Sequence, residues 1–402
     1  MGVERRDESK VVAERLARNG PVEERPWAYS ILAVLYSLEG DQRRSLDAAQ
    51  AAVEADPEFA RGHAFIANTA YYIGLTEMEL AGWRAALAAK DAQGVTPEAR
   101  AERRVTHQIQ IDGMTGDFSG AASRLSTLLE ANEDASGSDW LMAWAAMNFA
   151  NHHQPSQALK LAARTAARSD AERLPYAING AVMPVGYEAA AAVDRWPEAR
   201  AEIEGAVASL PPGAFWVDVL DVHLRPRLAV ARARTGNLQG AAEAIAPTAR
   251  DCEPCLRARG EVAALSGEPA ASDQWFAEAV RQAPSSPFAF AAWGQAKLAR
   301  GDVEGAIRLF RQAQQLGPRW ADPLKFEGDA LARRGDHRTA LRRYQAALER
   351  APQWGAAHLA AGRSLAALRR PERAADAYRR ALQLDLNASD RAAALRLSGA
   401  AA

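Results

Sequence analysis

The chain has 402 residues, of which 48% are hydrophobic and 25% are charged, and this composition indicates a folded protein rather than a disordered one. Forty-nine Lys and Arg against fifty Asp and Glu leave a formal net charge of -1, which argues against attraction of the whole chain to nucleic acid or to anionic membranes. No apolar run approaches the roughly 18 residues of a membrane-spanning helix, and the N-terminal segment lacks the apolar core of a signal peptide, so we expect a cytoplasmic protein.

The N-terminal segment, residues 1–25, is expected to form a capping helix. Its apolar residues Val11, Val12 and Leu16 recur at helical spacing on one side, and Gly20 is a helix-stopping residue directly after them. A short amphipathic helix of this kind covers the open end of a larger helical array.

Residues 26–91 contain two units of one pattern, each with a first helix, a tight turn and a second helix. The first unit turns at Gly40-Asp41, and Gly74 stands at the equivalent place in the second unit. Glycine accepts the left-handed backbone that ends a helix, and aspartate caps the next one. We therefore predict two regular helix pairs in this region.

Residues 92–252 are predicted to hold divergent units with longer loops, which we align on the small residue where the second helix of a pair crosses the first. Across the chain these anchor residues are Ser45, Glu79, Ala121, Ala158, Ala199, Ala241, Ser272, Ala306, Ala340 and Ala374. The spacing between them is the same at the two ends of the chain and irregular in the middle. The alignment predicts about ten repeats, of which Glu79 marks the weakest.

Residues 253–386 are predicted to form four regular units, followed by a cap or tail at residues 387–402. A glycine, an alanine and an aromatic residue recur at one fixed spacing: Gly294, Ala306 and Phe310, then Gly328, Ala340 and Tyr344, then Gly362, Ala374 and Tyr378. The two small residues let the paired helices approach, and the aromatic residue one turn later fills the space between them.

This pattern resembles the tetratricopeptide repeat (TPR), a helix-turn-helix unit of about 34 residues. The resemblance implies an all-α, right-handed α-solenoid, and the stretched middle units with a regular Ala- and Arg-rich end are similar to TPR regions of multidomain bacterial regulators. It also implies a non-enzymatic scaffold without a cofactor, whose concave groove binds a partner protein or peptide. Neither nucleic acid nor a membrane is an expected partner.

In the family, one stripe of positions on the first helix of each unit lines the groove. Carried onto this sequence, those positions are Arg61, Asn68, Tyr71, Arg103, Gln110, Trp140, Met147, His223, Arg257, Gln295, Lys325, Asp329 and Arg363. TPR proteins that hold chaperone tails grip a carboxylate with Lys and Asn at two of these positions. Here Lys325 is followed by Asp329, an acid that would repel a carboxylate, so we do not expect that activity.

Two further features carry chemical alternatives. Cys252 and Cys255 form a Cys-x-x-Cys, which is a weak candidate for a redox pair or half of a zinc site, but a zinc site needs about four ligands and no second such motif exists. We interpret them as ordinary cysteines of an inter-repeat loop and expect no metal site. His152 and His153 fall where the fourth unit needs its turn, and we expect them to be exposed loop residues.

Two rival functions remain beside the scaffold. A small-molecule or peptide sensor would enclose its ligand in the divergent middle units, and an enzyme or enzyme subunit would use the same cleft, with an acid such as Glu188. The sequence contains no HExxH, P-loop, GxGxxG or GxSxG motif, which favours the two binding functions. The oligomeric state is left open.

Overall fold

The structure is a computed structural model that describes residues 3–89, 95–131, 138–166, 185–210 and 213–399. The described residues form helices and no strand, which confirms the all-α solenoid predicted from the sequence. Within this part of the chain, no helix combines the length and the apolar character needed to cross a membrane.

Consecutive helices pack as antiparallel pairs, and ten such pairs lie in the described part of the chain. The N-terminal arm comprises α2 (Arg25–Leu38) with α3 (Gln42–Ala55), α4 (Ala60–Ile73) with α5 (Thr76–Ala88), α6 (Pro97–Thr115) with α7 (Phe118–Ala131), and α8 (Ser138–Asn151) with α9 (Pro155–Ala166). The middle arm comprises α11 (Val185–Ala191) with α12 (Trp196–Ala208), and α14 (Arg225–Arg234) with α15 (Leu238–Ile245).

The C-terminal arm comprises α16 (Glu253–Leu265) with α17 (Pro269–Gln282), α18 (Pro287–Ala299) with α19 (Val303–Leu316), α20 (Asp322–Arg333) with α21 (His337–Arg350), and α22 (Gly355–Ala367) with α23 (Pro371–Leu382). A short helix α13 (Ala214–Asp218) and a π-helical turn η2 (Val219–Leu224) lead into α14. At the ends of the array lie α1 (Val3–Asn19), the 3-10 turn η1 (Val22–Glu24) and α24 (Ala388–Ser398).

Small residues at the helix crossings explain why the pairs are close. All ten anchor residues are buried, and the hydroxyl of Ser45 donates to the carbonyl of Ala33 at 2.8 Å across its pair. A Cβ added to Gly294 would lie 2.5 Å from the ring of Phe310, and one on Gly328 would lie 2.6 Å from the ring of Tyr344. The aromatic residue therefore occupies the space that the glycine leaves.

The second unit departs from this pattern. A Cβ on Gly82 would lie 2.9 Å from Ala67 on the facing helix, so Gly82 provides the close approach in α5, one helical turn after Glu79. Glu79 is the fourth residue of α5, as Ser45 is of α3 and Ala306 is of α19, so its alignment as the anchor of this unit agrees with the helix bounds although the residue is not small. The Glu79 side chain is buried and lies on the wall of a cavity described below.

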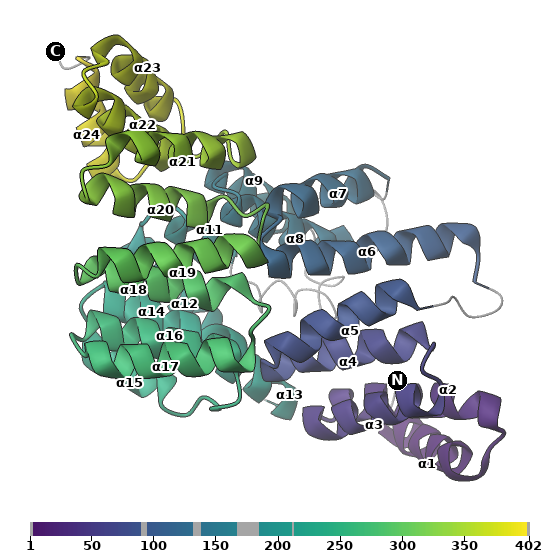
Figure 1. Ribbon diagram of the computed structural model, residues 1–402. Helices are drawn as coiled ribbons and strands as arrows, with labels where there is room; N and C mark the ends of the chain where they lie inside the picture. The colour runs from purple at the N-terminus through teal and green to yellow at the C-terminus, as the bar shows by residue number, and fades with distance from the viewer. Residues whose placement is uncertain (1–2, 90–94, 132–137, 167–184, 211–212, 400–402) are drawn as a thin grey trace.

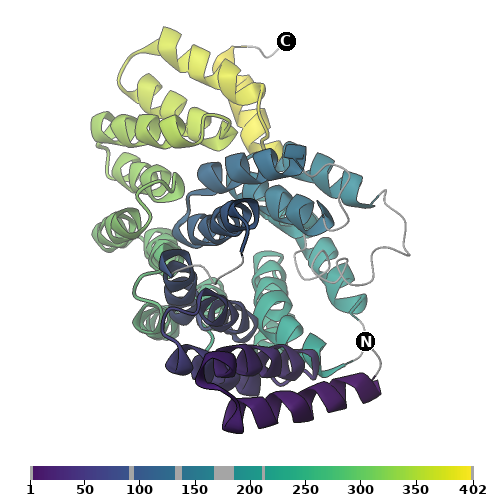
Figure 2. The same ribbon diagram turned by 90° about the vertical axis from the view of Figure 1, so that its right-hand side faces the viewer.

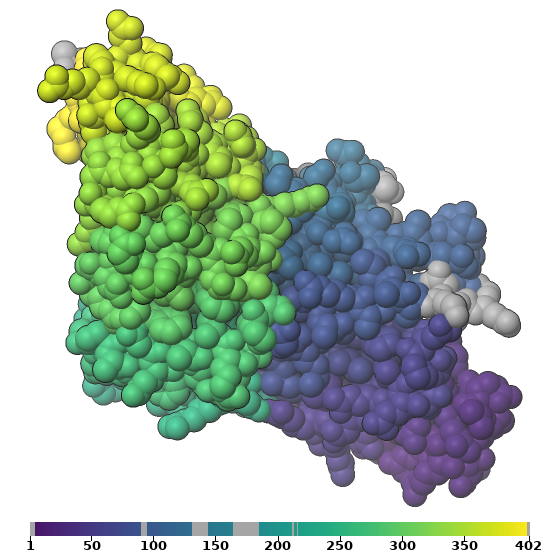
Figure 3. Space-filling view, in the orientation of Figure 1, coloured from purple at the N-terminus to yellow at the C-terminus, as the bar shows by residue number. Residues whose placement is uncertain are grey.

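The solenoid folds back on itself. In Figure 1 the chain rises from α2 to α9, descends through the middle arm, and rises again from α16 to α24 beside the N-terminal arm. Figure 2, turned by 90°, separates the middle arm from the other two. The space-filling view shows the C-terminal arm meeting the N-terminal arm along a continuous seam (Figure 3).

Equivalent positions of successive repeats form the contacts of this seam. Arg43 and Glu77 stand two residues before their anchors in the N-terminal arm, whereas Asp251 and Ser285 precede the first helices α16 and α18. Arg43 pairs with Asp251 at 2.5 Å, and Glu77 accepts hydrogen bonds from the hydroxyl of Ser285 at 2.7 Å and from its backbone N–H at 3.0 Å. Repeats of the two arms thus meet in register.

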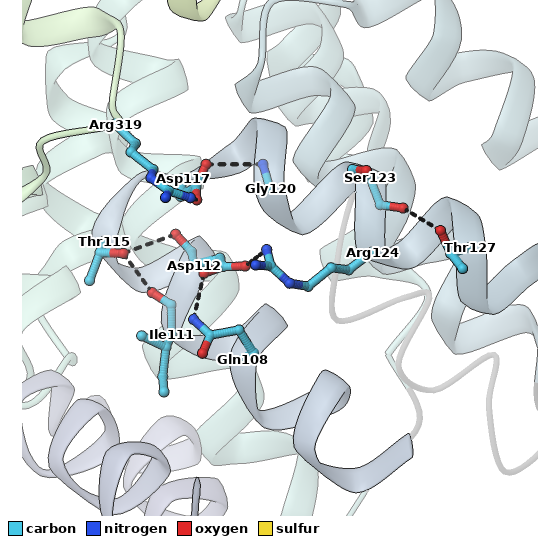
Figure 4. A network of polar contacts seen from close by, with 10 residues as sticks. All are labelled: Gln108, Ile111, Asp112, Thr115, Asp117, Gly120, Ser123, Arg124, Thr127 and Arg319. Carbon is cyan, nitrogen blue, oxygen red and sulfur yellow. Dashed lines mark hydrogen bonds and ion pairs between the residues drawn. The ribbon is translucent and has the colours of Figure 1, made fainter. Parts of the chain in front are cut away.

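The next contact of the seam joins the turn between α6 and α7 to the segment before α20. Asp117 caps α7 by accepting from the N–H of Gly120 at 3.0 Å, and it also pairs with Arg319 at 2.8 Å (Figure 4). Gly116 has a φ of 81°, and a Cβ there would lie 2.5 Å from Trp320. Only a residue without a side chain fits this contact.

Two more contacts continue the seam. His153, at a φ of 60°, replaces the usual turn glycine, stacks on Trp354 with ring centroids 3.6 Å apart and hydrogen-bonds Asp322 at 2.8 Å. The hydroxyl of Ser156 donates to Asp385 at 2.6 Å. The expectation that His153 is an exposed loop residue is wrong, because docking of the C-terminal arm leaves it only 8% exposed.

Candidate binding cavities inside the solenoid

Docking of the arms leaves an inner cavity of about 420 Å³ between them, which is open to solvent on one side. Its wall comes from helices α4 to α8 of the N-terminal arm, from α11, α12, η2 and α14 of the middle arm, and from α16 and α18 of the C-terminal arm. The lining residues are Tyr71, Gly74, Thr76, Glu79, Gly113, Met114, Phe118, Asn151, Tyr187, Glu188, Trp196, His223, Pro226, Arg227, Val230, Glu253, Pro254, Arg257, Ala258, Glu261 and Phe288.

Two groups of charged residues stand on this wall. Glu188 of α11 pairs with Arg227 of α14 at 2.7 Å. Arg257 of α16 lies between two acids of its own helix, at 3.2 Å from Glu253 and 3.9 Å from Glu261. The cavity therefore carries ordered charges of both signs, as in sites that orient a polar ligand.

Tyr71 and His223 form the contact between α4 and the π-helical turn η2. Their rings stack with centroids 4.1 Å apart, and the backbone of Tyr71 hydrogen-bonds the imidazole. Burial, reinforced by the positive charge of Arg227, lowers the pKa of His223 to about 3. The imidazole is therefore neutral at physiological pH, and its Nε2 is buried without a hydrogen-bond partner among the described residues.

Glu79 is the second perturbed group of the inner cavity. Burial raises its pKa to about 8, and repulsion by Glu253 acts in the same direction. The carboxyl group is thus mostly protonated at neutral pH and is able to donate a hydrogen bond.

A second cavity of about 250 Å³ lies further along the C-terminal arm. Its lining residues are His153, Ala191, Ala192, Val193, Asp194, Trp196, Arg234, Glu261, Gln295, Asp322, Lys325, Phe326, Trp354, Ala356, Asp385, Leu386, Asn387 and Asp390. Lys325 pairs with Asp329 at 2.8 Å, and its ammonium lies 5.7 Å from the ring centroid of Trp354. Trp196 and Glu261 line both cavities, so the two are adjacent.

The structure distributes the predicted groove residues over several places. Tyr71, His223 and Arg257 meet at the inner cavity, whereas Gln295 and Lys325 line the second one. Both sets come from the stripe on the first helices, and their role in partner binding stays a prediction.

The remaining predicted groove residues lie outside both cavity walls. Asp329 accepts from the hydroxyl of Tyr344 at 2.9 Å, and Met147 packs against the core of the N-terminal arm. Arg61 and Asn68 on α4, Arg103 and Gln110 on α6, and Arg363 on α22 lie elsewhere on the first helices, and Arg61 packs over the ring of Trp27. The side chain of Trp140 lies outside the described part of the chain.

Sequence reasoning missed Arg227 and Glu253, which line the inner cavity. Arg227 lies in the divergent middle region, where the repeat register is hard to assign because the π-helical turn adds to the first helix. Glu253 follows Cys252 at the start of α16 and accepts from the hydroxyl of Thr76 at 3.2 Å. The signal available in the sequence was an acidic residue in the first turn of a helix, directly after Cys252.

Cys252 and Cys255 form a disulfide, and both are fully buried. Cys252 caps α16, and the carbonyl of Gly74 accepts from the N–H of Glu253 at 3.0 Å, so the cysteines belong to the seam rather than to a free inter-repeat loop. Across the described residues, no cluster of three or more His, Cys, Asp or Glu side chains is arranged to hold a metal ion.

These features define a class: the chain is a TPR-like α-solenoid with cavities between its arms. No protein-family model and no curated protein sequence matches it. Among solved structures, a chain of the APC/C heterotetramer Cut9-Hcn1 shares 11% identity over 98% of this chain and 80% of that chain, with a TM-score of 0.51. That likeness supports the repeat fold.

Two other solved structures have lower scores. Yeast Tom70 shares 13% identity over 99% of this chain and 95% of that chain, with a TM-score of 0.44. PilF of Pseudomonas aeruginosa shares 17% identity over 44% of this chain and 82% of that chain, with a TM-score of 0.36.

Proposed function

We propose that this protein is a non-enzymatic binding protein that holds a segment of a partner protein along the inner face of the solenoid. The observation that carries the proposal is the position of Arg257, Glu261, Gln295 and Lys325. These residues occupy the first helices of three consecutive repeats, and all of them line one or both of the adjacent cavities. An extended peptide segment that contacts one of these side chains in each repeat fits such a row.

The arrangement of the charged groups favours binding over catalysis. Glu188, the acid expected for an enzyme, is paired with Arg227 at 2.7 Å. A general base needs a free position toward a substrate, which this ion pair does not offer. We therefore retain the binding function as the first candidate.

A steric plug tests where the segment binds. Gly113 lines the inner cavity, and a Cβ there would meet only Asn148, at 3.8 Å, so Gly113→Trp fills the space without a backbone clash. Gly205→Trp is the matched control, because Gly205 is exposed on α12 with nothing within 4 Å of its Cβ position. Peptides selected from a random display library on the wild-type protein are then measured on both variants.

We expect Gly113→Trp to lose affinity for the selected peptides by at least about tenfold, since the plug removes the volume they occupy, while Gly205→Trp retains it. Circular dichroism and the melting temperature check that both variants are folded. Equal binding by the two variants contradicts the proposal.

A sensor of a small molecule is the second candidate, because the inner cavity of about 420 Å³ lies within the size range of small-molecule sites. Native mass spectrometry of the purified protein distinguishes the two functions. A bound small molecule that is lost in Gly113→Trp supports the sensor.

The cytoplasmic location also stays a proposal. The disulfide between Cys252 and Cys255 is a bond that oxidising compartments preserve, whereas cytosolic thiols are normally kept reduced. Its redox state in cells grown under normal conditions, measured by alkylation and gel shift, tests the location.

A further inference from the structure

We infer that the two adjacent cavities form one acidic channel that binds an extended cationic chain, with its ammonium or guanidinium groups beside surplus carboxylates. This inference rests on the proposed function and narrows the partner segment to one rich in Lys or Arg.

The first argument is the charge balance of the channel wall. Eight acidic side chains and four basic side chains line the two cavities. Even with Glu79 protonated, seven carboxylates face four cations. Asp390 pairs with Arg363 from outside the wall at 3.8 Å, which leaves six carboxylates against four cations. Arg227 and Arg257 each already lie beside an acid, and Lys325 pairs with Asp329 outside the wall, so a surplus of negative charge remains.

The surplus is not a consequence of the average composition. Residues 287–386 of the C-terminal arm contain 18 Lys and Arg against 10 Asp and Glu, a net charge of +8. Most of these arginines, such as Arg308, Arg338 and Arg373, are exposed away from the cavities. From this stretch of 287–386 the channel wall receives Asp322 and Asp385, with Lys325 as the cation beside them. Positive charge is therefore concentrated on the outer surface of this arm, and negative charge on the channel wall.

The second argument is the buried imidazole of His223, which has an unused acceptor. His223 lines the inner cavity and is 6% exposed. It hydrogen-bonds the backbone of Tyr71 and leaves Nε2 buried without a partner among the described residues. A neutral imidazole that donates through one nitrogen accepts through the other. An ammonium or guanidinium group, which only donates hydrogen bonds, complements such an acceptor.

The third argument is that cations of the protein itself already occupy aromatic faces in the channel. Arg234 lies 5.1 Å from the ring centroid of Trp196, and Lys325 lies 5.6 Å from that of Phe326. A cation over a ring is stabilised by the negative ring face, most strongly where water is excluded. The channel is thus built for the kind of group that we assign to the ligand.

The test uses three probes: a blocked peptide of about eight residues alternating Lys and Ala, its Glu and Ala analogue, and spermidine. Isothermal titration calorimetry on the full chain measures binding at low and at moderate salt. We expect the lysine peptide to bind at least about tenfold more tightly than the glutamate peptide, with affinity that falls as salt rises.

Variants of the wall localise the effect. Glu261→Gln and Asp194→Asn each remove one negative charge, and Asn tolerates the left-handed backbone of Asp194, whose φ is 55°. Both substitutions are expected to lower the affinity for the lysine peptide by roughly three- to tenfold. Lys325→Met removes a competing cation and is expected to raise the affinity for the same peptide. Glu304→Gln, at an exposed position of α19, is the control without effect.

The outcomes separate the two proposals. If library-selected peptides bind in the channel but are neutral or acidic, the cationic ligand is overturned and the peptide-binding function stands. Spermidine binding without lysine-peptide binding supports the cationic channel and contradicts a peptide partner. Equal affinity for the lysine and glutamate peptides overturns the inference.

Discussion

Tyr71 and His223 stack face to face although they lie far apart in the sequence, with ring centroids 4.1 Å apart. The first belongs to α4 of the N-terminal arm and the second to the turn that precedes α14. Because this contact helps to bury His223 away from water, the imidazole must stay neutral for the arms to remain together.

The folded protein is expected to lose stability in mild acid through His223. Its pKa is about 3 when folded and near 6.5 when unfolded, so the unfolded chain binds the proton first and stability falls as pH drops below 6.5. The loss is roughly 2 to 3 kcal/mol between pH 6.5 and pH 4.5. Urea denaturation at both pH values measures it.

His223→Gln is the comparison for this prediction, because glutamine does not titrate. A part of the acid dependence should persist in the variant, since burial lowers the pKa of His107 to about 4 by the same mechanism. An unchanged pH dependence in His223→Gln would show that His223 is not buried as a neutral group.

Glu79→Gln should stabilise the protein increasingly as pH rises. The carboxyl has a pKa of about 8 when folded against 4.5 for the free group, so the wild-type protein loses stability between these values as the unfolded chain releases the proton. The wild-type protein loses on the order of 3 kcal/mol of unfolding free energy between pH 4.5 and pH 7, and the variant does not, because glutamine does not titrate. Equal pH profiles for wild type and variant would contradict the buried, protonated state.

Matched glycine substitutions test the seam. Gly74→Ala, Gly116→Ala and Gly236→Ala all place alanine at a positive φ, which costs about 1 kcal/mol. At Gly74 the new Cβ would lie 2.6 Å from the sulfur of Cys252, and at Gly116 it would strike Trp320, whereas nothing lies within 4 Å at Gly236. We expect an additional loss of about 1 to 3 kcal/mol at the first two positions only.

Small-angle X-ray scattering of the same three variants measures whether the arms separate. Separation of the arms in Gly74→Ala or Gly116→Ala enlarges the radius of gyration, and Gly236→Ala leaves it unchanged. A wild-type radius in both seam variants, together with equal stability losses at all three sites, would show that the arms do not depend on this packing.

The disulfide yields a chemical prediction. In denaturant without a reductant no thiol should react with Ellman's reagent, and after reduction two should react, since Cys252 and Cys255 are the two cysteines of the chain. Because the bond closes a very short loop, replacing both residues by Ser is expected to cost only about 2 kcal/mol. Two reactive thiols before reduction would contradict the bond.

The repeat architecture was predictable because its determinants are local. Gly294 and Phe310 lie on the two helices of one pair, and a fixed period exposes them in the sequence alone. The placement of Arg257 and Lys325 on an inner face follows from helical periodicity in the same way.

The seam was not predictable, because each side of it is an ordinary surface residue until the partner is known. Arg43 and Asp251 are half-exposed even when paired, and nothing local connects two residues so distant in the sequence. His153 illustrates the same limit: a turn residue is expected in solvent, and only docking against Trp354 buries it. The inner cavity forms only when the arms meet at the seam, so it could not be predicted from the sequence either.

The register of the seam has a consequence for folding. An open solenoid unfolds repeat by repeat, since each unit contacts only its neighbours. Here Arg43, Glu77 and Ser156 reach partners in a distant arm of the chain, so fraying at one end removes contacts at the other. Such non-local closure raises contact order and slows folding, and it also couples the arms into one cooperative unit. Insertion of a single whole repeat in the middle arm would preserve every local contact and still displace every pairing of the seam.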